Sequence, residues 1–185
     1  MHLQATLSRD DLVDVFHGLL PLTIRIGGPE QTIAFYEPKS LTLVADDGLR
    51  LVCKAKIVWP VLGIKVPILV HEVVVRIRPD IEERADGAAL VFHLSLEHAD
   101  FALLPDAVDR TITELINVEL AKDPVDLSWA FARTLTLSVP LPDAIEPPTE
   151  LSLGVVSHEL LITDNAMGLG IGLYAKVGVS KEHAQ

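Results

Sequence analysis

Seven histidines are the residues of this chain best suited to metal binding or proton transfer. They are spread along the sequence as His2, His17, His71, His93, His98, His158 and His183. No pair has the His-x-x-x-His or Glu-x-x-His spacing that would place two ligands on one helix face. Some have a glutamate as direct neighbour, in His71-Glu72, Glu97-His98 and His158-Glu159. Because adjacent side chains of a strand point to opposite faces, such pairs cannot share a metal, and we expect no metal site.

The nucleophilic side chains give no stronger signal. A serine hydrolase of the nucleophile-elbow type needs Gly-x-Ser-x-Gly on a sharp turn, and the chain lacks this motif. The dipeptide Ser157-His158 falls in an expected strand, so its two side chains diverge. Cys53, the single cysteine, lies on the apolar face of another expected strand, where burial raises the pKa of a thiol and lowers its reactivity. We therefore expect no catalytic residue and no enzyme, unless residues distant in sequence converge in the fold.

Two further patterns imitate functional motifs. Gly168, Gly170 and Gly172 resemble part of a phosphate-binding loop, but they alternate within an expected strand, and no helix or suitably placed lysine follows. Close packing or strand curvature explains these glycines better. The acidic pair Asp46-Asp47 falls in a turn without a partner that would separate its two pKa values, so we interpret it as solvated charge.

The overall composition argues against polyanionic partners. The chain carries 26 acidic and 15 basic residues, a formal net charge of −11, and a negative field repels phosphate backbones. Aromatic residues make up only 5%, which leaves few stacking surfaces for nucleotides or sugars. Hydrophobic residues make up 49%, yet no run approaches the roughly 20 apolar residues of a membrane span. The apolar excess must be buried in a core or line a cavity.

The length of 185 residues suits one hydrophobic core. We expect a single domain over residues 1–185, with flexible ends at 1–7 and 180–185. The N-terminal residues lack the basic, apolar and small-residue order of a secretory signal. We therefore expect a cytoplasmic protein, or a periplasmic one if a leader precedes residue 1. No motif points to a cofactor, and we expect none.

The elements that would position a site begin with two amphipathic helices. The first is expected over residues 8–20, because Ser8 is a suitable N-cap, acidic residues follow it, and Pro21 ends the helix. The second is expected over residues 104–120, with Pro105 in its first turn. Each has an aliphatic stripe at helical spacing, which predicts that one side of the helix faces an apolar interior.

Elsewhere the apolar residues recur with a period of two, which is typical of strands with one buried face. The clearest strand follows the turn Asp46-Asp47-Gly48, whose Asp-Gly dipeptide favours a tight hairpin. Pro60 and Pro67 favour a bend or sheet edge between two long strands. The expected strands are 22–26, 33–36, 41–45, 49–59, 68–78, 90–96, 135–141, 151–163 and 169–177. Their order predicts a meander of long antiparallel strands in an α+β fold.

The order of elements carries a family resemblance. An amphipathic helix ending in Leu19-Leu20-Pro21-Leu22 comes first, followed by long strands and a second amphipathic helix. The segment Leu135-Thr-Leu-Ser-Val-Pro-Leu and a closing hairpin complete the chain. This order resembles the tubular lipid-binding (TULIP) superfamily, in particular its small bacterial single-module members. The resemblance covers most of the chain and rests on element order.

The resemblance implies a long, strongly curved antiparallel β-sheet wrapped around amphipathic helices, with an apolar groove between them for acyl chains. It also implies a protein without catalytic activity. The residues that it assigns to lipid binding are the inward-facing apolar side chains of the two helices. They are Leu12, Phe16, Leu19, Val108, Ile112, Leu115 and Ile116.

We therefore expect non-catalytic binding or transport of a lipid or another hydrophobic small molecule. The alternative is a structural or protein-interaction module with a filled core and no ligand, because periodicity does not distinguish a filled core from an open channel. Nucleic acid is not expected as a partner. Transient membrane contact and a homodimer are both left open.

Overall fold

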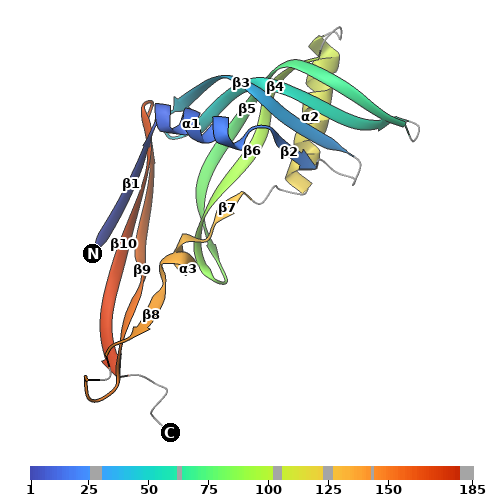
Figure 1. Cartoon of the computed structure of the whole chain (residues 1–185). Helices are drawn as coiled ribbons and strands as arrows, with labels where there is room; N and C mark the ends of the chain where they lie inside the picture. Colours follow the sequence, from blue (N-terminus) through green and yellow to red (C-terminus); the bar gives the residue numbers. More distant parts are fainter. Residues whose placement is uncertain (26–30, 62–63, 102–105, 123–126, 143, 180–185) are drawn as a thin grey trace.

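Antiparallel strands dominate the computed structural model, which describes residues 1–25, 31–61, 64–101, 106–122, 127–142 and 144–179. They form a six-stranded sheet of order β2-β3-β4-β5-β6-β7 and a four-stranded sheet of order β1-β10-β9-β8. The six-stranded sheet curls into an open half-barrel, and the four-stranded sheet projects from one end of it (Figure 1). We call the first the curved sheet and the second the arm. A curved antiparallel sheet is thus present, as the family resemblance implies.

The curved sheet consists of four long strands, β3 to β6, between two short edge strands, β2 and β7. They are β2 Leu22–Arg25, β3 Thr32–Val44, β4 Gly48–Val61, β5 Ile64–Arg84, β6 Gly87–Phe101 and β7 Ser128–Trp129. The register shifts within the β3–β4, β4–β5 and β5–β6 pairs. Because such irregularities bend a strand and increase its twist, they let the 21-residue strand β5 follow the curl of the sheet.

Strand β3 joins two segments that the alternation predicts as separate strands. Its register with β4 shifts between Tyr36 and Ser40, and Glu37 has a φ of 47°. Pro38 lies within this irregularity, where its missing N–H costs no ladder hydrogen bond. The expectation of two strands was therefore wrong, because a proline inside a bulge does not end a strand.

The segment between Pro60 and Pro67 was expected at a sheet edge or bend, and the two prolines themselves lie within β4 and β5. In the β4–β5 hairpin, Pro60 pairs with Lys65 and Pro67 with Val58. The pairing continues to Val61 and Ile64, so β5 begins before the expected start at residue 68.

Glycine is required where β4 begins. Gly48 has a φ of 135°, and a Cβ added there would lie 2.4 Å from the carbonyl oxygen of Ile77. The hairpin is the one that Asp46-Asp47-Gly48 predicts. Its positive φ values, however, fall on Asp46, at 59°, and on Gly48, and not on Asp47.

The arm consists of β1 His2–Ser8, β10 Ala166–Val179, β9 Thr149–Ile162 and β8 Leu137–Pro140. Strand β1 pairs with the first half of β10, from Ser8 opposite Ala166 to His2 opposite Gly172. Residues 1–7, which the sequence suggests to be flexible, are thus largely strand. The other expected flexible end, 180–185, lies outside the described residues.

Three helices occur in the described ranges. In α1 Arg9–Leu19 the Ser8 side chain accepts a hydrogen bond from the N–H of Asp11, and the Asp11 carboxylate accepts one from the N–H of Ser8. This capping box fixes the start of α1 where the sequence predicts it. Helix α2 Asp106–Lys122 packs against β6, and the short helix α3 Phe131–Leu135 lies between β6 and β9.

Helix α2 also completes the edge of β6. Among the described residues, β7 pairs with β6 only at Leu90 and Val91. Farther along β6, the Asn117 side chain accepts a hydrogen bond from the N–H of Leu96 and donates one to its carbonyl oxygen, each at 2.8 Å. One amide side chain thereby satisfies both backbone groups that a neighbouring strand would satisfy.

Two clusters of buried side chains lie on the apolar faces of the sheets. The larger cluster joins Leu12 of α1 and Ile116 of α2 to the curved sheet, and it includes Cys53. Cys53 is completely buried, and this burial raises the pKa of its thiol to about 12, as the sequence suggests. The smaller cluster joins Phe131 of α3 to Leu90 of β6 and to the base of the arm.

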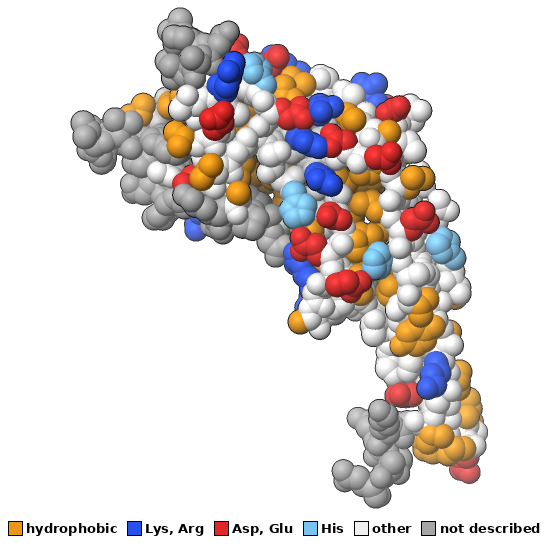
Figure 2. Space-filling view, turned by 180° about the vertical axis from the view of Figure 1, so that it is seen from behind, with side chains coloured by type: hydrophobic (Ala, Val, Ile, Leu, Met, Phe, Trp, Pro, Cys, Tyr) orange, Lys and Arg blue, Asp and Glu red, His pale blue; other side chains and the backbone are white. Residues whose placement is uncertain are grey.

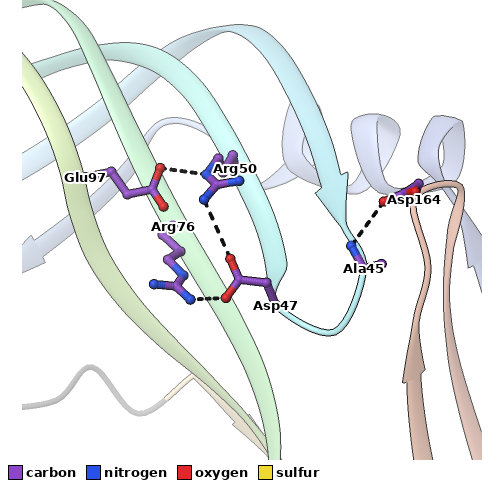
Figure 3. Close-up of polar contacts among 6 residues, drawn as sticks. All are labelled: Ala45, Asp47, Arg50, Arg76, Glu97 and Asp164. Carbon is purple, nitrogen blue, oxygen red and sulfur yellow. Dashed lines mark hydrogen bonds and ion pairs between the residues drawn. The ribbon is translucent and has the colours of Figure 1, made fainter.

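Hydrogen bonds donated by two backbone N–H groups attach the base of the arm to the curved sheet. The N–H of Ala45, in the β3–β4 turn, donates to Asp164 Oδ1 in the β9–β10 turn at 3.2 Å (Figure 3). The N–H of Asp46 donates to the carbonyl oxygen of Ile162, also at 3.2 Å. The two hairpin turns are thus held against each other.

A row of ion pairs stiffens the same turn. Asp47 forms ion pairs with Arg76 and, at 3.7 Å, with Arg50, and Arg50 contacts Glu97 at 2.7 Å (Figure 3). The hydrogen bond from Arg50 to Glu97 raises the pKa of Arg50. Charged side chains of both signs are interspersed over the back of the curved sheet (Figure 2). Within the acidic pair, Asp47 therefore contributes to an ion-pair network and is not only solvated charge.

Candidate hydrophobic cavity

A hollow of about 340 Å³ lies between α1 and one face of the curved sheet. We call it the aliphatic cavity. Helix α1 contributes Leu12, Val15, Phe16 and Leu19. The curved sheet contributes Leu22, Phe35, Leu49, Leu51, Val75, Ile77, Phe92 and Leu94. The remaining lining residues are Leu7 and Met167 of the arm, Leu20 after α1, Leu127 before β7, and Ser128 and Trp129 of β7.

The floor of the aliphatic cavity is a grid of cross-strand neighbours. Ile77 of β5 pairs with Leu49 of β4 on one side and with Leu94 of β6 on the other. Next to it, Leu51 pairs with Val75. Because side chains alternate along a strand, these residues point to one face, while Arg50 and Arg76 between them point to the other. The period of two in the sequence thus produces an aliphatic floor with the charges behind it.

Helix α1 covers part of this floor and leaves an opening. Leu12 is almost fully buried, with 3% of its surface exposed. One turn and two turns farther along the helix, Val15 and Leu19 are 45% and 56% exposed although both line the cavity. The capping box at Ser8 fixes the start of this helix and therefore the position of the covering stripe. We infer that the cavity opens to solvent along the exposed side of Val15 and Leu19.

The lining of the cavity offers mainly apolar contact. Among the described residues that line it, none is charged, and the polar groups are the hydroxyl of Ser128 and the indole N–H of Trp129. A lining of this kind can bind a hydrocarbon. Its specificity must come from shape and from apolar burial.

The predicted binding residues of α1 line the aliphatic cavity, and the described ones of α2 do not. Leu12, Phe16 and Leu19 of α1 line the aliphatic cavity together. On α2, Ile116 is fully buried in the larger core cluster, Ile112 packs against that cluster, and Leu115 is 51% exposed. None of these three lines the aliphatic cavity. The side chain of the fourth predicted residue of α2, Val108, lies outside the described residues.

Sequence reasoning missed the residues of the sheet that form the floor. The alternation does identify the apolar face of each strand, which includes Leu49, Leu51, Val75 and Leu94. It does not reveal where the sheet curves away from a helix to leave a hollow. The signal that could have found the floor is an aliphatic row on adjacent strands close to an amphipathic helix.

The histidine pairs lie on strands, as predicted, and none lines the cavity. His158 Nε2 lies 3.9 Å from Glu83 Oε1, with its ring edge-on to Phe131. His93 Nε2 lies 3.4 Å from Glu82 Oε1. In the described part of the chain, no three His, Cys, Asp or Glu side chains come together in a group that could hold a metal ion.

The glycine series also lies in a strand, β10, without a phosphate-loop geometry. A Cβ on Gly172 would lie 2.2 Å from Ser157 Oγ, so close packing explains this glycine. Neither Gly168 nor Gly170 is as crowded. Ser157, the neighbour of His158, therefore packs against β10.

A second hollow, of about 510 Å³, lies between β6 and α2. Its lining includes the polar residues Glu82, Arg84, His93 and Asn117. The amide of Asn117 is already engaged by both backbone groups of Leu96. The second hollow is thus beside a structural contact, and the aliphatic cavity is the stronger candidate for a binding site.

Comparison with known proteins identifies no family: no family model, curated protein or solved structure matches this chain. Neither α1 nor α2, nor any other helix within the described ranges, has the length and apolar character needed to cross a membrane. Membership of the tubular lipid-binding superfamily stays a prediction from element order.

Proposed function

We propose that the protein binds a lipid or another hydrophobic small molecule in the aliphatic cavity and carries it without chemical change. The observation that supports this most directly is the hollow of about 340 Å³ with an almost entirely apolar lining. Its volume falls within the roughly 300–1,000 Å³ of small-molecule sites. A packed protein core, in contrast, leaves few voids larger than a water molecule.

In the proposed complex, the curved sheet wraps around α1 and the ligand lies between them, as the resemblance to tubular lipid-binding proteins implies. The opening along Val15 and Leu19 would admit the ligand. The fixed start of α1 and the aliphatic floor below it would position an extended hydrocarbon without specific polar contacts.

The lining also predicts which ligands bind best. Each buried CH₂ group contributes about 0.8 kcal/mol, so ten of them give roughly 8 kcal/mol before the cost of association is subtracted. No charged residue of the described lining is available to recognise a head group. Affinity should therefore rise with chain length until the cavity is full, and a fatty acid and the fatty alcohol of equal length should bind alike.

The first experiment is native mass spectrometry of protein purified from its own host, followed by solvent extraction of the bound material. We expect a stoichiometric apolar adduct whose mass gives the ligand class. A clean apo mass, together with no uptake of a fluorescent fatty acid, would contradict the proposal.

A pair of matched variants places the ligand in the molecule. Val15→Trp introduces a large side chain at the opening of the cavity, whereas Val118→Trp makes the same change on α2, at a valine of similar exposure that does not line the cavity. We expect Val15→Trp to weaken uptake of the fluorescent fatty acid by about tenfold or more, and Val118→Trp to leave it unchanged. Equal binding by both variants would show that the ligand lies elsewhere.

The alternative is a structural or protein-interaction module with a filled core and no ligand. It requires that no hydrocarbon enters the aliphatic cavity, so the mass spectrometry and the uptake experiment distinguish it from ligand binding.

A further inference from the structure

A further hollow, of about 340 Å³, lies between β6 and α2. Among the described residues, three carboxylates line it, those of Glu97 on β6 and of Asp109 and Glu114 on α2. The basic side chains of this lining are those of His98 and Arg110. We call this hollow the acidic hollow. Its volume is in the range of small-molecule sites, and no described residue lines both it and the aliphatic cavity.

One face of α2 carries a polar side chain at every fourth position, namely Asp109, Thr113 and Asn117. Residues four apart lie on the same side of a helix, and all three line the acidic hollow. The Asn117 amide bonds both backbone groups of Leu96, and Thr113 Oγ1 donates to the backbone carbonyl oxygen of Asp109 at 2.8 Å. Two of the three side chains thus have a structural partner.

The carboxylate of Asp109 is the exception on this face. Asp109 is only 6% exposed, and its Oδ1 is the one buried side-chain oxygen without a hydrogen-bond partner among the residues that the structure describes. Glu97, in contrast, has Arg50 at 2.7 Å. An ionised carboxylate only accepts hydrogen bonds, and a buried acceptor without a donor is rare because its desolvation is uncompensated. Asp109 therefore lacks a donor in a place where the fold leaves room for one.

We propose that the acidic hollow binds a small organic cation through a primary ammonium group, which donates a hydrogen bond to Asp109. An ammonium group supplies both the donor and the positive charge, and hydrogen bonds between two charged groups are the strong ones. The torsion that orients an aspartate carboxylate has only broad preferences, so Asp109 can turn either oxygen toward the hollow that it lines. Glu114 adds a second carboxylate to the same lining, and the chain as a whole, at −11, attracts cations.

Other occupants fit the acidic hollow less well. A metal ion needs several ligands at once, and no three His, Cys, Asp or Glu side chains of the described ranges form a group that could hold one. An anion would meet three carboxylates. A single water molecule could donate to Asp109, but it occupies only about 30 Å³ and leaves the charge unmatched.

A nuclear magnetic resonance titration of the full chain with butylammonium chloride, at constant ionic strength, tests the proposal. We expect saturable shifts of the backbone amides of Glu97 and His98, with a dissociation constant in the millimolar range for so small a probe. Asp109→Asn keeps the size of the side chain and removes its charge, and Asp10→Asn makes the same change near the start of α1, at an exposed residue outside the hollow. We expect Asp109→Asn to raise the dissociation constant by about tenfold or more and Asp10→Asn to leave it within about twofold.

Two further probes test the wild-type chain without any substitution. Tetramethylammonium has the charge but no N–H donor, and butanol has a donor but no charge. We expect each to bind at least about tenfold more weakly than butylammonium, because the proposed contact needs both properties. Butylammonium that gives no saturable shift up to about 100 mM overturns the proposal, as does equal binding of tetramethylammonium or an equal effect of the two asparagine variants. Calcium that binds more tightly than butylammonium, and only while Asp109 is present, would assign the hollow to a metal and overturn the amine.

Discussion

The curved sheet and the arm are made from the same kind of sequence and differ in what covers them. In both regions, aliphatic residues alternate with polar ones along paired strands. On the curved sheet, α1 and α2 cover the apolar face and the hollow under α1 forms the aliphatic cavity. On the arm, α3 covers only the base, and toward the tip orange side chains remain visible at the surface (Figure 2). The alternation thus specifies which face is apolar, but a separate element decides whether that face is core, cavity or surface.

The largest expected difference is in the free energy of unfolding of two variants, which change residues on one face of β10. Ile171→Asp buries a carboxylate in the cluster around Phe131, so we expect a loss of about 4 kcal/mol or more in the free energy of unfolding. Val177→Asp makes the same substitution where no described residue covers the side chain, and we expect a change within about 0.5 kcal/mol.

Urea denaturation measures the free energy of unfolding of both variants. Similar losses for the two would mean that the outer half of the arm is covered within the monomer. The arm would then not differ between a base covered by α3 and an uncovered tip.

The second prediction compares the two helices that cover the curved sheet. Leu19→Asp and Leu115→Asp change leucines of similar exposure on α1 and α2, but only Leu19 lines the aliphatic cavity. We expect Leu19→Asp to weaken binding of a fluorescent fatty acid by about tenfold, because the apolar contact of roughly two CH₂ groups is lost. Leu115→Asp should bind as the wild-type chain does.

A fluorescence titration of both variants measures this difference. If Leu115→Asp weakens binding and Leu19→Asp does not, the ligand lies at α2. The resemblance to tubular lipid-binding proteins would then have placed the site more accurately than the cavity does.

The smallest effect concerns the start of α1. Ser8→Ala removes the capping box and should reduce stability by about 1 kcal/mol. It should also weaken binding in the aliphatic cavity, whose cover is α1. Thermal unfolding and ligand titration of one preparation measure the two effects. A loss of stability with unchanged binding would show that the start of α1 does not position the cover of the cavity.

The same cap predicts a pH dependence. The hydrogen bonds from the side chain and the backbone N–H of Ser8 lower the pKa of Asp11 in the folded chain. A carboxyl group whose pKa is lowered by folding stabilises the fold above its unfolded pKa and loses this contribution as the pH falls through the folded pKa. The wild-type chain should therefore lose more stability on acidification than Ser8→Ala does, in parallel thermal unfolding series.

The parts of the fold that depend on local signals were predicted well. The Ser8 cap and Pro21 give both ends of α1, and the Asp-Gly turn gives the β3–β4 hairpin. Features that depend on distant partners were not predictable in this way. Strand β1 forms because β10 offers an edge more than 150 residues away, and Pro38 is tolerated because β4 can shift register opposite it. The predicted residues of α1 line the aliphatic cavity, whereas Ile116 of α2 lies in the core, because periodicity does not measure the distance between a helix and a curved sheet.

The two hydrogen bonds between Asn117 and Leu96 have a consequence for solubility. An edge strand with unpaired backbone groups acts as a template onto which another chain can add, and this is a common start of aggregation. Strand β6 reaches to Phe101, while β7 pairs with it only at Leu90 and Val91 within the described residues. By occupying both backbone groups of Leu96, the amide of Asn117 and the helix that carries it deny that edge to other chains. A side chain that contributes nothing to the cavity thus protects the curved sheet from growing beyond its own strands.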